Sequence, residues 1–152
     1  MKPKFEATAI LELPLAQAEA AILDVRTGPP GQGHVWLLGD TTGAVTGGPQ
    51  RFTAMLGNYR LTVDVDRERR TIATQGGWWY RGEYALEPAG PHTRVTHRVY
   101  NVAGPATRWG VPLANRLFIG FQAQTRASFA DTVRDMGKRL GCRVSLPDPV
   151  AT

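Results

Sequence analysis

The residues of this sequence best suited to acid–base chemistry are Tyr84 and His97, which lie on either side of the turn-forming segment Ala89–His92. If this segment joins two antiparallel strands, Pro88 pairs with Thr93 and Tyr84 faces His97 on one side of the sheet. The imidazole can act as a general acid or base near neutral pH, with the phenol within hydrogen-bonding reach. The pair also fits two roles without catalysis: a buried imidazole satisfied by the phenol, or a polar anchor for a ligand. Both residues are therefore catalytic candidates and not assigned catalytic residues.

The other pairs of this hairpin support the same register. On the face of Tyr84 and His97 the pairs are small or apolar, namely Leu86 with Val95 and Gly82 with Val99. On the opposite face the pairs carry opposite charges, namely Glu83 with Arg98 and Glu87 with Arg94. A shift of one residue would mix the two sets, because side chains alternate between faces along a strand. We therefore expect the face of Tyr84 and His97 to be the concave, buried one.

Aromatic and polar residues around this pair are predicted to line a ligand pocket. Apolar walls with a few polar anchors are typical of small-molecule sites. The apolar sector of the expected C-terminal helix also contains the polar residues Gln122, Thr125 and Thr132. They favour a pocket over a dry core, since buried polar groups need partners. The expected ligand-binding residues are Trp78, Tyr80, Tyr84, His97 and Asn101 on the sheet, and Phe118, Phe121, Gln122, Thr125 and Phe129 on a helix. Ordinary core packing of the same residues is the alternative interpretation.

An antiparallel sheet must position the first part of this set. Residues Lys4–Leu13 alternate apolar and polar side chains like a half-buried strand, and Pro14 then opens a short amphipathic helix. The Gly- and Pro-rich segment Thr27–Gly33 is predicted to be a loop, followed by a short strand at His34–Leu38. The remaining strands are expected at Gln50–Leu56, Asn58–Val65, Arg70–Gly76, Trp78–Pro88 and Thr93–Ala103.

A long C-terminal helix must position the second part. Pro112 suits the first turn of a helix, and Gly141 suits a C-terminal stop after Leu140. At helical spacing one sector contains the apolar residues Leu117, Phe118, Phe121, Phe129, Val133, Met136 and Leu140. The opposite sector contains Arg116, Arg134 and Lys138. We expect the apolar sector to lie against the concave face of the sheet.

The composition bounds the classes of function. The 152 residues suit a single domain, expected at residues 1–145 with a C-terminal tail at 146–152. The single cysteine excludes an internal disulfide, and the sequence contains no motif for a metal, a cofactor or a nucleophilic serine. The N-terminus lacks a signal-like apolar region and no segment approaches the roughly 18 apolar residues of a membrane span, so a cytoplasmic protein is expected. The net charge of +5 permits an anionic partner, but the arginines are scattered and form no basic run.

Two segments give the sequence a family resemblance. FEATAILELPLAQAEAAILDV resembles the opening of the START-like (SRPBCC) superfamily, and YALEPAGPHTRVTHRVYNVAG is similar to its penultimate hairpin. The resemblance is to the polyketide cyclase/dehydrase and lipid-transport type. It implies an α+β helix-grip fold, in which a curved antiparallel sheet of about six to seven strands wraps a long C-terminal helix over a cavity. The segment Thr27–Gly33 departs from the family, which has a second short helix there.

The resemblance implies binding or transport of a hydrophobic small molecule, such as a lipid or a polyketide, in that cavity. The alternative is an aromatase/cyclase-type enzyme that uses Tyr84 and His97 on a polyketide-like substrate. A nucleic-acid binder is the third hypothesis and is favoured only by the net charge. A homodimer through Trp79 and Tyr100 is also considered, because both are expected on the outer face of the sheet.

Overall fold

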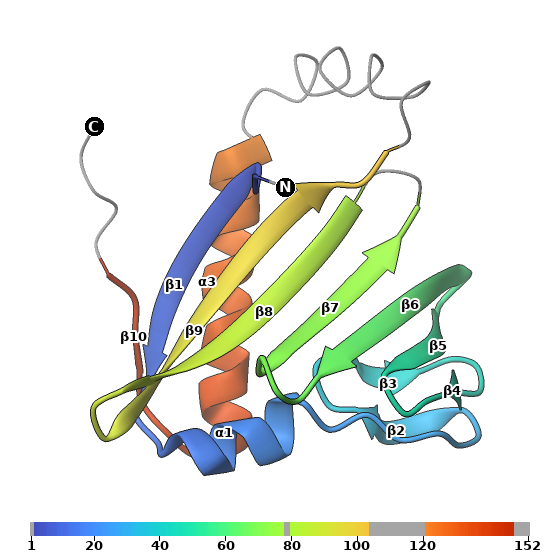
Figure 1. Ribbon diagram of the computed structural model, residues 1–152, viewed down its shortest axis with the longest axis horizontal. Helices are drawn as coiled ribbons and strands as arrows, with labels where there is room; N and C mark the ends of the chain where they lie inside the picture. Colours follow the sequence, from blue (N-terminus) through green and yellow to red (C-terminus); the bar gives the residue numbers. More distant parts are fainter. Residues whose placement is uncertain (1, 78–79, 104–120, 148–152) are drawn as a thin grey trace.

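The computed structural model describes residues 2–77, 80–103 and 121–147. Within these ranges the chain is α+β, with a large antiparallel sheet, a short N-terminal helix and a long C-terminal helix (Figure 1). The main sheet has eight strands in the order β10-β1-β9-β8-β7-β6-β5-β4. They are β1 (Phe5–Leu11), β4 (Thr46–Gly47), β5 (Arg51–Leu56), β6 (Tyr59–Asp66), β7 (Thr71–Gly76), β8 (Tyr80–Ala89), β9 (His92–Asn101) and β10 (Val144–Ser145). A separate sheet pairs β2 (Gly31–Val35) with β3 (Gly39–Thr41).

The β8–β9 hairpin has the register that the sequence predicts. Its pairs include Tyr84–His97, Leu86–Val95, Gly82–Val99, Glu83–Arg98 and Glu87–Arg94. The two charged pairs approach to 3.8 and 3.7 Å between nitrogen and oxygen atoms. The turn is shorter than expected, because Ala89 and His92 are themselves paired and only Gly90 and Pro91 lie between them. Gly90 has φ +61°, a conformation that glycine adopts without steric cost.

The sheet has more strands than the six to seven expected. The additional strands β4 and β10 have two residues each and form the two edges of the sheet. Segments this short leave no alternation in the sequence, so a periodicity argument cannot find them. The predicted loop Thr27–Gly33 is wrong in part, because Gly31–Gly33 belong to β2. The predicted strand His34–Leu38 continues only to Val35.

Helix α1 (Leu15–Ile22) follows β1 as predicted. Pro14 precedes it in an extended conformation, with φ −61° and ψ 145°, which the proline ring favours. The helix buries Ala18 and Ile22, four residues apart on one face. Val25 lies beyond the helix, where it forms an isolated antiparallel bridge with Val35.

Helix α3 (Phe121–Leu140) ends where the sequence predicts, whereas its expected start near Pro112 lies outside the described residues. The amide of Cys142 donates to the Gly137 carbonyl (2.9 Å), and the amide of Gly141 donates to the Lys138 carbonyl (3.3 Å). Gly141 itself has φ +68°. These two bonds around a left-handed glycine form a Schellman motif, which satisfies carbonyls at the end of the helix.

Helix α3 presents its apolar sector to the interior. Phe129, Val133 and Met136 are buried, whereas Arg134 and Lys138 are exposed. Figure 1 shows α3 running behind β1, β9 and β8. The helix therefore covers the face of the sheet to which Tyr84 and His97 belong.

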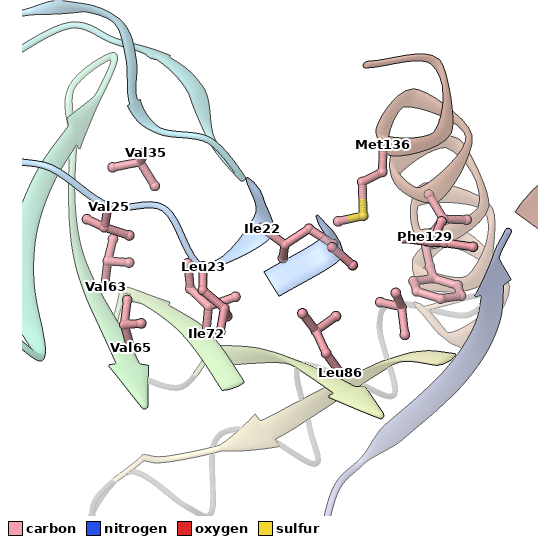
Figure 2. Close-up of a cluster of buried hydrophobic side chains, with 14 of the residues drawn as sticks. Ile22, Leu23, Val25, Val35, Val63, Val65, Ile72, Leu86, Phe129 and Met136 are labelled. Carbon is pink, nitrogen blue, oxygen red and sulfur yellow. The ribbon is translucent and has the colours of Figure 1, made fainter. Parts of the chain in front are cut away.

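The core is continuous from α3 to the segment around β2. Figure 2 shows Phe129 and Met136 of α3 near Leu86 of β8, with Ile22 of α1 beside them. The same figure shows valines of β6 and of the β2 region at the other end of the cluster, namely Val25, Val35, Val63 and Val65. Burial of each such side chain contributes about 1.5–3 kcal/mol, so this cluster fixes the position of α3 on the sheet. Neither helix in the described ranges is long and apolar enough to span a membrane.

Candidate functional site

A pocket of about 300 Å³ lies between the sheet and α3. Residues from both elements form its wall, so its shape depends on how the helix packs on the sheet. The described lining residues are Tyr80, Tyr84 and His97 from the sheet, and Gln124, Thr125, Ser128, Phe129 and Thr132 from α3.

The sheet side of the pocket follows from the alternation of side chains along β8. Tyr80, Gly82 and Tyr84 are two residues apart and share one face. A Cβ atom on Gly82 would lie 2.8 Å from the Tyr80 hydroxyl and 3.1 Å from Cε1 of His97. The absence of a side chain at Gly82 thus allows the Tyr80 hydroxyl and the edge of the His97 ring to approach the same point of the strand.

Three aromatic rings form a stack at the pocket. The rings of Tyr84 and His97 have centroids 4.3 Å apart and an interplanar angle of 23°. The rings of His97 and Phe129 are nearly parallel, at 7°, with centroids 5.9 Å apart. Phe5 of β1 meets the His97 ring edge-on at 6.3 Å. The imidazole is therefore held in one orientation by its neighbours on β8, α3 and β1.

The hydrogen bonds of His97 differ from the expected bond with Tyr84. Nδ1 of His97 lies 3.2 Å from the main-chain carbonyl oxygen of Glu83. Because a carbonyl only accepts hydrogen bonds, this contact requires the proton on Nδ1, which leaves Nε2 of the neutral ring as an acceptor. Burial lowers the pKa of His97 to about 4, although the bond to Glu83 opposes that shift. The imidazole is thus uncharged at neutral pH.

The two tyrosines of the pocket, Tyr80 and Tyr84, are also uncharged at neutral pH. Burial raises the pKa of Tyr84 well above its usual value, and the neighbouring Tyr80 raises it further. A hydrogen bond between the hydroxyls of Tyr84 and Thr132 acts in the opposite direction. Burial also raises the pKa of Tyr80. Both phenols can therefore donate or accept hydrogen bonds, and neither supplies a phenolate.

The helix side of the pocket is more polar than expected. Gln124, Ser128 and Thr132 are spaced by four residues, so they form one row along α3. None of the three was among the predicted ligand-binding residues, although Thr132 was one of the polar residues whose place in the apolar sector favoured a pocket. The spacing of four residues is the signal that could have identified the row. Of the eight described lining residues, only Phe129 has a side chain without a polar atom. The described wall therefore differs from the mostly apolar wall that we expected.

The remaining predicted pocket residues do not lie among the described lining residues. The side-chain oxygen of Asn101 accepts a hydrogen bond from the Ala103 amide (3.0 Å), at the end of β9. Phe121 and Gln122 belong to the first turn of α3, but their side chains lie outside the described part of the structure, as do residues Trp78 and Phe118. Of the residues considered for a dimer contact, Trp79 is outside the described ranges and Tyr100 is half-buried on β9.

A larger hollow, of about 700 Å³, lies on the opposite face of the sheet. There Asp64 accepts hydrogen bonds from Nε of Arg51 and from Nη1 of Arg81, each 2.7 Å long. Burial raises the pKa of Asp64, but the bonds from the two arginines outweigh this effect and hold the pKa below its usual value. The floor includes Ala73, and the charged walls are joined by ion pairs. This hollow is larger than the pocket under α3, but charged side chains form most of its described lining, which disfavours a hydrophobic molecule.

The described residues contain no cluster of three or more His, Cys, Asp or Glu side chains that could hold a metal ion. Burial raises the pKa of the Cys142 thiol, which disfavours the reactive thiolate. The polar atoms of the pocket are accordingly hydroxyl, amide and imidazole groups. Such groups can orient a bound molecule through hydrogen bonds.

Comparison with known proteins supports the fold and goes no further. No protein-family model matches the sequence, and no curated protein matches it. Among solved structures the chain is similar to the protein TTHA0849 from Thermus thermophilus, with a TM-score of 0.51 and 13% sequence identity. The similarity covers 90% of this chain and 95% of that protein. At this identity the match shows a shared α+β fold over nearly the whole chain.

Proposed function

We propose that this protein binds or transports a hydrophobic small molecule, such as a lipid or a polyketide, in the pocket between α3 and the sheet. The observation that carries the proposal is a pocket of about 300 Å³ whose wall contains a stack of three aromatic rings. Small-molecule sites are typically concave, with aromatic walls and a few placed polar groups, and about 300 Å³ is at the lower end of their range.

A helix-grip fold of the START-like (SRPBCC) type is part of the same proposal. Its support is the order of elements: a strand, a proline and a short helix, then a meander of antiparallel strands, then a long helix behind the sheet. The segment around β2 and β3 remains a departure from the family, since it forms a small sheet where the family has a helix.

The electrostatics of the pocket favour binding over catalysis. A general base works best when its pKa is near the working pH. Burial lowers the pKa of His97 to about 4, so it is a weak base at neutral pH. Burial also raises the pKa of Tyr84, so its phenol is a weak acid. An aromatase/cyclase-type enzyme that uses this pair is therefore the less favoured hypothesis.

The distribution of charge argues against nucleic acid as the main partner. At least nine arginines in the described ranges lie within 4.0 Å of a carboxylate, which reduces their availability to phosphates. They are distributed over β5, β8, β9, α3 and the loops, so they do not form a single basic stripe.

The proposal can be tested with an environment-sensitive apolar dye and native mass spectrometry of the freshly purified protein. We expect saturable dye binding by the wild type, and a co-purified ligand if the natural one is retained. Thr125→Trp should weaken dye binding because the indole fills the pocket. Ala127→Trp is the matched control, since it adds the same ring at an exposed position of the same helix. Absence of saturable dye binding by the wild type, or equal dye binding by the two variants, would contradict the proposal.

A further inference from the structure

The pocket under α3 contains no charged side chain among its described lining residues. Gln124, Thr125, Ser128 and Thr132 carry amide and hydroxyl groups, and Phe129 carries none. The tyrosines and the histidine of the sheet are neutral at physiological pH, for the reasons given above. Moving an ionised group from water into such a site is costly unless an opposite charge compensates it. The described wall therefore favours an uncharged molecule.

Nε2 of His97 is a polar atom of the pocket that can act only as a hydrogen-bond acceptor. Nδ1 of His97 is occupied by the Glu83 carbonyl, so Nε2 can only accept. The adjacent atom Cε1 borders the space above Gly82, where the Tyr80 hydroxyl also lies. Cε1 is bonded to both ring nitrogens, and His97 is among the residues that line the pocket, so the acceptor Nε2 belongs to a pocket-lining ring.

The stacking partners of His97 fix the direction of its lone pair. Tyr84 and Phe129 lie against the ring within 23° and 7° of its plane. Stacking holds the plane of the imidazole, and the bond from Nδ1 to the Glu83 carbonyl fixes which edge carries Nε2, because a half-turn of the ring would break that bond. A donor that approaches Nε2 must lie near the plane of this ring, among flat aromatic surfaces that favour another planar ring.

The volume limits the size of the molecule. A pocket of about 300 Å³ lies at the lower end of the roughly 300–1,000 Å³ range of small-molecule sites, so it favours a small ligand. This space suits two fused aromatic rings with one or two substituents.

We infer that the pocket selects an uncharged, planar aromatic molecule with a hydroxyl or N–H group that donates a hydrogen bond to Nε2 of His97. This inference rests on the proposed binding function, and it names the chemical class of the ligand. A phenol, an enol or an indole-like N–H would each provide the required donor.

Three probes with the same two-ring skeleton test the inference at about pH 7: 2-naphthol, 2-methoxynaphthalene and 2-naphthoic acid. The first is an uncharged donor, the second lacks the donor, and the third is an anion. We expect 2-naphthol to bind about 3- to 10-fold more tightly than the ether, which is the range for one net hydrogen bond. The carboxylate should bind more than about 10-fold more weakly than 2-naphthol, because its charge would be unpaired.

The variant His97→Phe keeps an aromatic ring in contact with Tyr84 and Phe129 but removes the acceptor. It should abolish the difference between 2-naphthol and 2-methoxynaphthalene while binding of the ether is retained. If this variant fails to fold, nitrogen-15 NMR of the wild type gives an independent readout. The Nε2 resonance should then shift on addition of 2-naphthol and remain in place on addition of the ether.

The outcomes separate the inference from the function on which it rests. Equal affinity for the three probes, tightest binding of the carboxylate, or an Nε2 resonance that 2-naphthol leaves unchanged would overturn the inference, while saturable dye binding would still support the pocket. Failure of all three probes with retained dye binding would also overturn it. Failure of both probes and dye would remove the proposed function together with the ligand class.

Discussion

At the scale of single residues, His97 combines burial with a fixed protonation state. The residue is 5% exposed, and among the described residues its ring contacts three aromatic rings and one carbonyl oxygen. The charged residues next to the Tyr84–His97 pair along the two strands are Glu83 and Arg98, and their side chains lie on the other face of the sheet. Because no anion faces the ring among the described residues, protonation of His97 is opposed by the folded structure.

Because the folded structure disfavours protonation of His97, the first prediction is that His97 makes the stability of the protein depend on pH. The pKa of His97 is about 4 in the folded protein and close to the ordinary value of about 6.5 in the unfolded chain. Between these values the unfolded state binds more protons, so stability that is present above about pH 6.5 is lost as the pH falls toward 4. We expect wild type to lose about 2–3 kcal/mol more than His97→Gln between about pH 7.5 and pH 4.5, measured by urea unfolding. Identical pH dependence in the two proteins would refute a buried neutral imidazole.

The second prediction concerns Gly82. In Gly82→Ala the new methyl group would crowd the Tyr80 hydroxyl at 2.8 Å and Cε1 of His97 at 3.1 Å. We expect a loss of about 1–3 kcal/mol in the free energy of unfolding, the usual range for an overpacked site. In a Tyr80→Phe background the loss should be smaller, because the closest atom is gone. Calorimetric or urea unfolding of the four proteins of this double-mutant cycle gives the coupling, and a cycle without coupling would contradict the proposed contact.

At the scale of elements, the contact between α3 and the returning chain depends on a glycine inside the helix. A Cβ atom on Gly137 would overlap the side chain of Val144 and lie 3.0 Å from the Cys142 carbonyl oxygen. The helix therefore accepts a residue of low helix propensity so that β10 can lie close to it and pair with β1.

The third prediction tests this role. Alanine is about 1 kcal/mol more favourable than glycine inside an exposed helix, so Gly137→Ala would stabilise α3 if nothing were close to it. We expect destabilisation in the wild-type background, because Val144 and the following strand must move. In a Val144→Ala background the same substitution should be neutral or stabilising. Chemical unfolding of both pairs provides the measurement, and stabilisation by Gly137→Ala in the wild-type background would show the contact to be unimportant.

The sequence was informative wherever a pattern extends over several residues. Strand β1 was predicted from the alternation of Phe5, Ala7, Ala9 and Leu11. The register of the β8–β9 hairpin was predicted from its charge pairs, and the end of α3 from the glycine after Leu140. Two kinds of feature were not predictable. Strands of two residues have no period, and the bond from His97 to a main-chain carbonyl depends on atoms that no side-chain pattern reports. Tyr84 was correctly placed opposite His97, but the contact is a ring stack.

At the scale of the whole molecule, the two faces of the sheet differ in character. The face under α3 carries the apolar core and the pocket, and the opposite face carries ion pairs across β1, β5, β6, β8 and β9. Asp64 connects Arg51 and Arg81, so the β5–β6 part of the sheet is joined to β8 across β7.

The fourth prediction concerns this connection. Asp64→Ala would leave Arg81, whose side chain is 24% exposed, without its carboxylate partner. We expect a loss of about 1–3 kcal/mol, the usual cost of removing a partner from a charged hydrogen bond. Asp66→Ala is a suitable control, because Asp66 pairs only with Arg69 at 3.7 Å among the described residues, and both side chains are well exposed. Equal effects of the two substitutions on the midpoint of urea unfolding would contradict a special role for Asp64.

The two-residue strands at the margins of the sheet also bear on how this protein avoids self-association. A long unpaired edge strand is a template on which a second molecule can add its own strand, and short edges reduce that hazard. Strand β10 occupies the outer side of β1 at Ile10 and Leu11, and the amide of Glu12 donates to the Arg143 carbonyl (2.9 Å). A chain that ends at Cys142 would keep the helix cap but expose these backbone groups. It should form concentration-dependent aggregates that bind an amyloid-type dye, and Ile10→Lys should suppress them by placing a charge on the freed edge.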